Sequence, residues 1–63
     1  MINGKKLTLP RGTTIASFLE DMNLQHKSVV VEVNRDIIDR EKFGDIELKD
    51  GDEVEIVRFI GGG

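Results

Sequence analysis

Cysteine is absent from this chain of 63 residues, and its absence limits how so small a domain can be stabilised. A chain of about this length buries only around 60% of the surface that it exposes when unfolded. Small domains often add disulfides or a thiolate-bound metal, and neither is available without cysteine. The chain must therefore fold by packing one small core, and it has no thiol of its own for sulfur chemistry.

Composition indicates one globular domain and argues against two classes of partner. Hydrophobic residues make up 38% of the chain and charged residues 33%, which is an ordinary globular balance. No apolar run approaches the ~20 residues of a membrane span, and the opening sequence Met-Ile-Asn-Gly-Lys-Lys lacks the apolar segment of a signal peptide. The net charge of -3 argues against nucleic acid, which requires a clustered basic face. We therefore expect a cytoplasmic protein with no membrane or nucleic-acid partner.

The first segment has the signature of a β-hairpin. Asn3 and Gly4 tolerate the positive φ angles of a two-residue type I′ turn, and residues 6–9 alternate between polar and apolar side chains. We therefore predict two antiparallel strands at the start of the chain, one at Ile2 and one over residues 6–9.

The next segment has the periodicity of an amphipathic helix over residues 14–22. Thr13 or Thr14 can cap its first turn, and Asn23 can end it. Four apolar residues recur at i, i+3, i+4 and i+7, which places them on one helical face. These expected core residues are Ile15, Phe18, Leu19 and Met22.

Further strands are predicted downstream of the helix. Residues 29–33 are strongly β-forming, and alternate side chains share one face. Residues 37–38 can form a short strand, and Phe43 is expected to anchor the loop that follows. The last strand, over residues 53–59, comes after a turn in which Gly51 is expected at positive φ.

The last strand is apolar on both of its faces. Val54 and Ile56 share one face, whereas Val57 and Phe59 occupy the other, where polar residues would be expected. A single helix can cover only one face of the sheet. We therefore predict that Val57 and Phe59, with Ile60, form an exposed apolar patch of the kind that marks a partner surface; the alternative is packing at the sheet edge.

The sequence ends in three glycines, Gly61, Gly62 and Gly63. Glycine has no side chain to pack into a core, so we expect a mobile tail over residues 61–63 after a domain over residues 1–60. Extended at roughly 3.3–3.6 Å per residue, this tail places the last carboxylate about 10 Å beyond the domain on a narrow thread. That geometry suits a carboxylate on which another protein acts, and the alternatives are a frayed terminus or a cloning scar.

Two groups of ionisable residues are better explained as surface than as chemistry. His26 has no second His, Cys or carboxylate nearby at metal-ligand spacing. Asp39 and Glu41 lie in a run of four charged residues, which is typical of a solvated loop. The sequence therefore predicts no catalytic residue and no metal site.

The order of the elements, ββαβ(β)β, together with a diglycine end resembles the β-grasp, ubiquitin-like fold. This fold is of the α+β class, and it has a mixed sheet with one helix packed across one face. The motifs that carry a closer resemblance are Met1-Ile2-Asn3-Gly4, Thr14-Ile15-x-x-Phe18-Leu19, Val31-x-Val33-Asn34, Ile38-x-Arg40-x-x-Phe43, Leu48-x-Asp50-Gly51-Asp52-x-Val54-Glu55-Ile56 and the terminal glycines. In this order and spacing, the whole chain resembles the small sulfur carrier proteins of thiamin biosynthesis, the ThiS family, which supply sulfur for the thiazole ring.

The resemblance implies a carrier rather than an enzyme. In the family, an activating enzyme related to ubiquitin-activating enzymes uses ATP and Mg²⁺ to make an acyl-adenylate at the terminal glycine, here Gly63. A sulfur nucleophile from a persulfide then displaces AMP, and the thiocarboxylate gives its sulfur to thiazole synthase. The implied partners are therefore an adenylating enzyme, a sulfur donor protein and thiazole synthase, and no cofactor is tightly bound. The family requires Gly-Gly, so if Gly63 were trimmed or an artefact the roles would shift by one residue.

The resemblance also implies a division of labour at the end of the chain. Gly61 and Gly62 would thread into partner active sites, and the partner-binding surface would comprise Val57, Arg58, Phe59 and Ile60. Arg58 would pair with an acidic surface on a partner, unless it is an ordinary solvated arginine.

Three other functions stay open at this point. The small subunit of molybdopterin synthase has the same fold and ending, but its sequences usually run longer and often carry prolines where this chain has Arg58-Phe59-Ile60. A protein modifier would join its terminal glycine to a lysine of a target. An interaction module of ubiquitin-like fold would not use the glycines at all.

Overall fold

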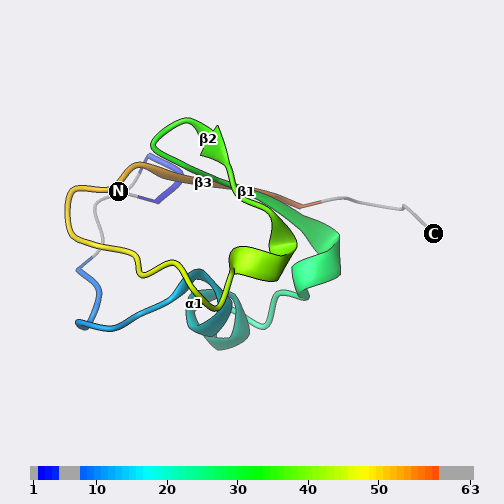
Figure 1. Cartoon of the computed structure of the whole chain (residues 1–63), viewed down its shortest axis with the longest axis horizontal. Coiled ribbons are helices and arrows are strands. Elements are labelled where there is room, and N and C mark those ends of the chain that lie inside the picture. The colour runs from blue at the N-terminus through cyan, green and yellow to red at the C-terminus, as the bar shows by residue number, and fades with distance from the viewer. Residues whose placement is uncertain (1, 5–7, 59–63) are drawn as a thin grey trace.

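The computed structural model describes residues 2–4 and 8–58 of the chain. Within these residues, one α-helix lies on one side of a sheet of three strands (Figure 1). The helices and strands are α1 (Ile15–Asp21), the 3-10 helix η1 (His26–Ser28), β1 (Val29–Val33), β2 (Asp36–Ile37), the 3-10 helix η2 (Arg40–Lys42) and β3 (Val54–Arg58).

The sheet has the order β2-β1-β3, and both strand pairs are antiparallel. The β1–β3 ladder runs from Val29 opposite Arg58 to Val33 opposite Val54. On the other edge of β3, Ile2 forms an isolated parallel bridge with Val54, which is the one parallel pairing in the described residues beside the three antiparallel strands. The predicted last strand is confirmed with its bounds at residues 54 and 58 in the described part of the chain.

The opening of the chain differs in part from the predicted hairpin. Asn3 and Gly4 have φ angles of 48° and 81°, which confirms the positive φ expected of that turn. Thr8 and Leu9 are not in a strand, whereas the remaining positions of the predicted second strand lie outside the described residues, so the hairpin pairing of Ile2 stays a prediction. Ile2 also forms a bridge with the last strand of the domain, which the sequence analysis did not predict. Turn chemistry is local, whereas the partner of Ile2 comes from the far end of the sequence, so the turn alone could not specify it.

The helix begins as predicted at Thr14. A capping box joins Thr14 to Ser17: the Ser17 N–H donates to the Thr14 hydroxyl at 3.1 Å, and the Thr14 N–H donates to the Ser17 hydroxyl at 3.0 Å. Asn23 follows the helix with a φ of 59°, the left-handed conformation that asparagine tolerates and that commonly ends helices. Both predicted helix signals are therefore confirmed.

Met22 was wrongly predicted as a core residue, since 57% of it is exposed. The helix ends at Asp21, and Met22 is its C-cap with φ and ψ of -88° and 1°. Met22 therefore follows the last helical residue, and its side chain does not continue the apolar stripe of the helix. Ile15, Phe18 and Leu19, the other three members, are buried as predicted.

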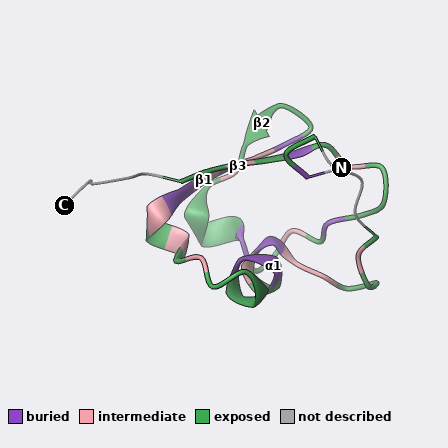
Figure 2. Ribbon diagram, turned by 180° about the vertical axis from the view of Figure 1, so that it is seen from behind, coloured by how far each residue is buried: buried purple, intermediate pink, exposed green. Residues whose placement is uncertain are grey.

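The core lies between α1 and the inner face of the sheet. Figure 2 shows buried residues in α1 and β1, whereas β2 is exposed. Phe43 is buried and its carbonyl accepts the Ala16 N–H at 2.9 Å, which confirms its predicted role as a loop anchor. Gly51 has a φ of 94°, as predicted for its turn. The buried core residues are Ile2, Ile15, Phe18, Leu19, Val29, Val31, Val33, Phe43, Leu48 and Val54.

The turn between β1 and β2 holds a strained residue, and its replacement should stabilise the domain. Asn34 and Arg35 have φ angles of 51° and 73°, and the left-handed region costs a residue with a Cβ about 1–2 kcal/mol. We expect Arg35→Gly to raise the free energy of unfolding by about 1 kcal/mol, because glycine's greater freedom in the unfolded chain offsets part of that relief. Urea denaturation measures the change. Arg35→Ala, which keeps the Cβ, should not stabilise the domain; equal stabilisation by both variants would show that the arginine side chain, and not its backbone, is the cause.

Candidate functional site

The exposed face of β3 carries the apolar residue that the sequence singled out. Val57 is 54% exposed, as predicted, whereas Val54 on the same strand points into the core. Phe59 and Ile60, the other predicted members of this patch, lie outside the described residues. Within the described residues, the prediction of an exposed patch can be tested only at Val57, and the exposure of Val57 is confirmed.

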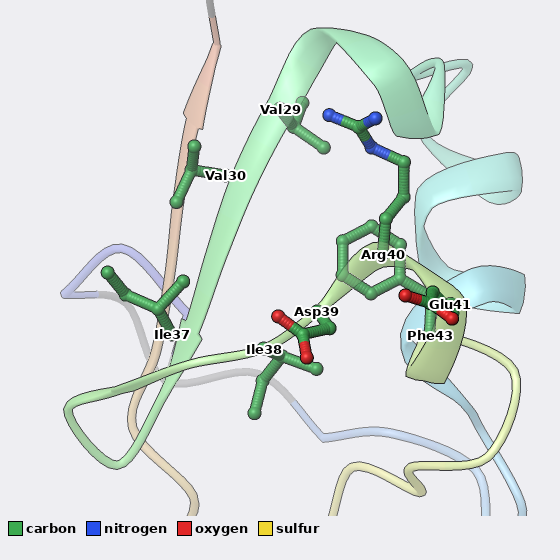
Figure 3. Close-up of a pocket in the computed structure, with 8 residues that line it drawn as sticks. All are labelled: Val29, Val30, Ile37, Ile38, Asp39, Arg40, Glu41 and Phe43. Carbon is green, nitrogen blue, oxygen red and sulfur yellow. The ribbon is translucent and has the colours of Figure 1, made fainter.

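Two residues that the sequence analysis did not assign to this surface lie on the same face of the sheet as Val57. Val30 on β1 stands directly opposite Val57 in the ladder, and it is half-buried. Ile37 on β2 is 69% exposed and stands opposite Glu32, on the same face of the sheet. Figure 3 shows Val30 and Ile37 on the same side of β1. We call Val30, Ile37 and Val57 the outer patch.

Alternation along the valine run placed Val30 on this face, but only strand register could bring it opposite Val57. The same register places Glu32 directly opposite Glu55. Like charges in that position repel each other. The exposed face is therefore apolar at the end of β3 that leads to the tail and acidic farther along the strand.

A hollow of about 620 Å³ adjoins the outer patch beside β1 (Figure 3). Its lining combines aliphatic side chains with both signs of charge, and no grouping of metal-ligating side chains is found in the described part of the chain. The lining residues are Val29, Val30, Ile37, Ile38, Asp39, Arg40, Glu41 and Phe43. We assign it no chemistry.

His26 is half-buried rather than fully on the surface. Its ring packs edge-on against Phe43, with 5.5 Å between ring centroids and 68° between ring planes. This aromatic contact accounts for its position at the start of η1 without a ligand.

Arg58 does not share the face of Val57. It stands opposite Val29, whose side chain is buried on the helix side of the sheet, and side chains of a strand alternate between faces. Arg58 lines a second hollow of about 400 Å³ on that side. The other residues of this hollow are Ile2, Asn3, Phe18, Met22, Leu24 and Ile56. Of the predicted partner-binding residues, Val57 and Arg58 therefore lie on opposite faces of the sheet, because the strand's alternation separates them.

Gly61, Gly62 and Gly63, together with the predicted boundary at residue 60, lie outside the described residues. β3 ends at Arg58, so the glycine sequence follows within a few positions of the strand that carries Val57. Among the described residues, no helix is both long and apolar enough to cross a bilayer.

Comparison with known proteins decides the family. The model of the ThiS family matches residues 1–63, which include the terminal glycines. The chain belongs to the ThiS family. It is 43% identical over 63 residues to the sulfur carrier protein ThiS of Bacillus subtilis (strain 168), and the match covers 98% of this chain and 96% of that protein.

Solved structures of this family have the same fold. The crystal structure of ThiS from Geobacter metallireducens matches with a TM-score of 0.82 and 35% identity, covering 100% of this chain and 96% of that one. The likeness confirms the predicted β-grasp fold of the ThiS family for this chain.

The chain also matches a part of longer enzymes. It is 33% identical over 63 residues to a thiazole synthase of Paramagnetospirillum magneticum, covering 100% of this chain but 19% of that protein. A thiazole synthase of Magnetococcus marinus shows 34% identity over 62 residues, again covering 19% of the enzyme. This ThiS-family chain is thus a sulfur carrier of thiamin thiazole biosynthesis and not itself an enzyme, as predicted.

Proposed function

We propose that the carboxyl group of Gly63 carries the sulfur of this ThiS-family protein, as a thiocarboxylate. The observation that supports this assignment best is that the family match extends through the terminal glycines, which follow within a few positions of a strand with an exposed apolar side chain. An ionised carboxylate resists nucleophilic attack because its carbon is electron-rich and oxide is a poor leaving group. Activation must therefore precede sulfur transfer.

The steps that we propose use reactants supplied by partners. A carboxylate oxygen of Gly63 attacks the α-phosphate of ATP on an adenylating enzyme, where Mg²⁺ is bound, and pyrophosphate leaves. The terminal sulfur of a donor persulfide then attacks the carbonyl carbon, the C–O bond to AMP breaks, and the C–S bond that forms makes an acyl disulfide. A thiol of a partner protein attacks the donor's sulfur, so that the S–S bond breaks, the thiocarboxylate leaves and the two partner sulfurs are joined in a disulfide. The thiocarboxylate gives its sulfur to thiazole synthase, and an oxygen from water regenerates the carboxylate. The carrier itself needs no tightly bound cofactor.

Gly61 and Gly62 serve this chemistry because they have no side chains. A backbone without side chains can enter a confined active site, and the unbranched Cα of Gly63 leaves its carbonyl carbon open to attack. Fixing each residue in a partner costs on the order of 1–2 kcal/mol of conformational entropy. That cost favours release as well as capture, and a carrier that visits successive enzymes requires both.

We propose that the outer patch is where the partners hold the domain while the tail is in use. Val57 and Ile37 are large apolar residues exposed on one face, and such patches mark protein interaction sites. Thiazole synthase is supported as one such partner because some thiazole synthases contain a segment similar to this entire chain. The adenylating enzyme is proposed as the second, since it must bind the same tail, and the sulfur donor as a third. Arg58, on the opposite face, would meet a separate acidic group of a partner.

The test is an intact mass of the purified protein before and after incubation with its adenylating enzyme, ATP and a sulfur donor. We expect a gain equal to the replacement of one oxygen by sulfur, located at Gly63 by fragmentation. ATP dependence would also agree with the cytoplasmic location that we propose. An unchanged mass, with the enzyme active on another carrier, would contradict the proposal and favour a protein modifier or an interaction module.

A further inference from the structure

Asn3 makes an unusual set of contacts with β3 from the N-terminal segment. Its backbone N–H donates to the Val54 carbonyl oxygen at 2.8 Å. Its side-chain Oδ1 accepts the Ile56 N–H at 2.8 Å, and its Nδ2 donates to the Ile56 carbonyl oxygen at 3.4 Å. One residue thus pairs with two alternate residues of the strand, and its carboxamide takes the place that a further backbone residue would occupy.

These contacts lie on the edge of β3 that faces away from β1. Backbone groups of a strand alternate between its two edges, so Val54 and Ile56 share the edge that meets Asn3. At Gly4 the chain turns, with a φ of 81°. The Asn3 carboxamide therefore continues the pairing begun at Ile2 by one more strand position, to within two residues of Arg58, where the described strand ends.

We propose that Asn3 is a positioning residue for the sulfur-carrier reaction. By holding the Ile56 backbone, it fixes the direction in which β3 delivers the following tail to a partner's active site. This inference rests on the proposed role of Gly63, because it concerns how the partner captures that tail. Without the carboxamide, the end of β3 is held along its β1 edge alone, its other edge is less restrained, and a smaller fraction of molecules presents the tail correctly.

The residue type fits both demands of the position. Asn3 has a φ of 48°, a left-handed conformation that glycine, asparagine and aspartate adopt most readily. Of these three residues, only asparagine supplies both an acceptor and a donor for the Ile56 backbone. Glycine at this position keeps the turn and removes both side-chain bonds.

Asn34 offers a matched control at the opposite end of β3. It also has a left-handed backbone, with a φ of 51°, and its Oδ1 accepts the Glu53 N–H at 3.0 Å. Its own N–H donates to the Glu53 carbonyl oxygen at 2.7 Å. The two asparagines therefore make similar contacts with the same segment of chain, but Asn34 holds the start of β3 and Asn3 the part that leads to the tail.

The experiment compares Asn3→Gly with Asn34→Gly as substrates of the adenylating enzyme, with KM and kcat measured separately. We expect Asn3→Gly to raise the KM for the carrier about tenfold, because a tenfold smaller competent population weakens apparent affinity tenfold. Its kcat at saturation should be unchanged. We expect Asn3→Gly and Asn34→Gly to lower the free energy of unfolding in urea by similar amounts. Only Asn3→Gly should raise KM. If KM depended on stability alone, both variants would raise it equally.

A conservative variant provides a second readout. Asn3→Asp keeps an acceptor for the Ile56 N–H but loses the donor, so we expect a KM rise of roughly threefold, as for one hydrogen bond. If Asn3→Gly does not fold, the KM of Asn3→Asp is compared with that of the wild type instead. An unchanged KM for Asn3→Asp would then overturn the inference. Hydrogen exchange of the Ile56 amide should accelerate in Asn3→Gly, while that of the Glu53 amide should not.

The outcomes separate this inference from the proposed function. If the wild-type carrier is not adenylated at Gly63, the proposed function fails before Asn3 is tested. A wild type that is adenylated normally, with equal KM values for it and for folded Asn3→Gly, overturns the positioning role alone. Equal KM increases in Asn3→Gly and Asn34→Gly would also overturn it, because the effect would then be one of general stability.

Discussion

Gly63→Val is expected to abolish adenylation of the carrier while leaving the domain folded. A β-branched side chain beside the reacting carboxyl group widens the thread and shields the carbonyl carbon. A small misplacement of reacting atoms can cost on the order of a hundredfold in rate. We therefore expect ATP-dependent pyrophosphate release to fall by at least about that factor, with no gain of sulfur in the intact mass.

Gly44→Val is the matched control for this substitution. Gly44 is exposed on a turn of the described chain, and a Cβ added there would meet no atom within 4 Å. We expect this variant to be adenylated like the wild type, and both variants to retain the far-ultraviolet circular dichroism of the folded domain. Normal adenylation of Gly63→Val would eliminate the threading argument, even if the family assignment stands.

Val57→Gln is expected to weaken binding of the carrier to its adenylating enzyme by about tenfold. This factor corresponds to a loss of about 1–2 kcal/mol of binding free energy, which is the effect of an interface residue that contributes substantially to affinity. The substitution places a neutral polar group on the β3 side of the outer patch and adds no charge beside Glu55. Because Val57 is 54% exposed in the free domain, unfolding free energy should change little. Titration calorimetry with the adenylating enzyme measures the dissociation constant.

Met22→Gln provides the comparison for Val57→Gln. Met22 is 57% exposed, nearly the same as Val57, but it lies at the end of α1 on the other side of the sheet. We expect its dissociation constant to match that of the wild type, whereas Ile37→Gln should behave like Val57→Gln. Equal weakening by Met22→Gln and Val57→Gln would show that the outer patch has no special part in docking.

Local chemistry in the sequence predicted much of the secondary structure. The hydroxyl of Thr14, the left-handed backbone of Asn23 and the turn at Gly51 follow from interactions within a few residues, and all three are confirmed. The alternation of the valines in β1 likewise follows from the two-residue period of a strand. Met22 shows the limit of periodicity, because a stripe predicts burial only while the helix continues.

The parts of the candidate site that follow from the order of residues along the chain could be predicted from the sequence. The exposure of Val57 follows from a strand with two apolar faces and a domain with one helix to cover them. The glycine ending and the motif order were enough to indicate the ThiS family, and the family match confirms it. The chemistry assigned to Gly63 remains a prediction from that ending.

By itself, therefore, the sequence determined the turns, the helix cap, the strand periods and the order of elements that marks this family. Only the tertiary structure decided that Val30 stands opposite Val57, that Ile37 shares their face of the sheet, and that Asn3 holds the strand before the tail. The physical reason is that strand register and long-range pairing depend on packing and hydrogen bonds between segments far apart in the chain. A turn or a periodic run acts through neighbours, so it specifies an element without specifying what that element will meet.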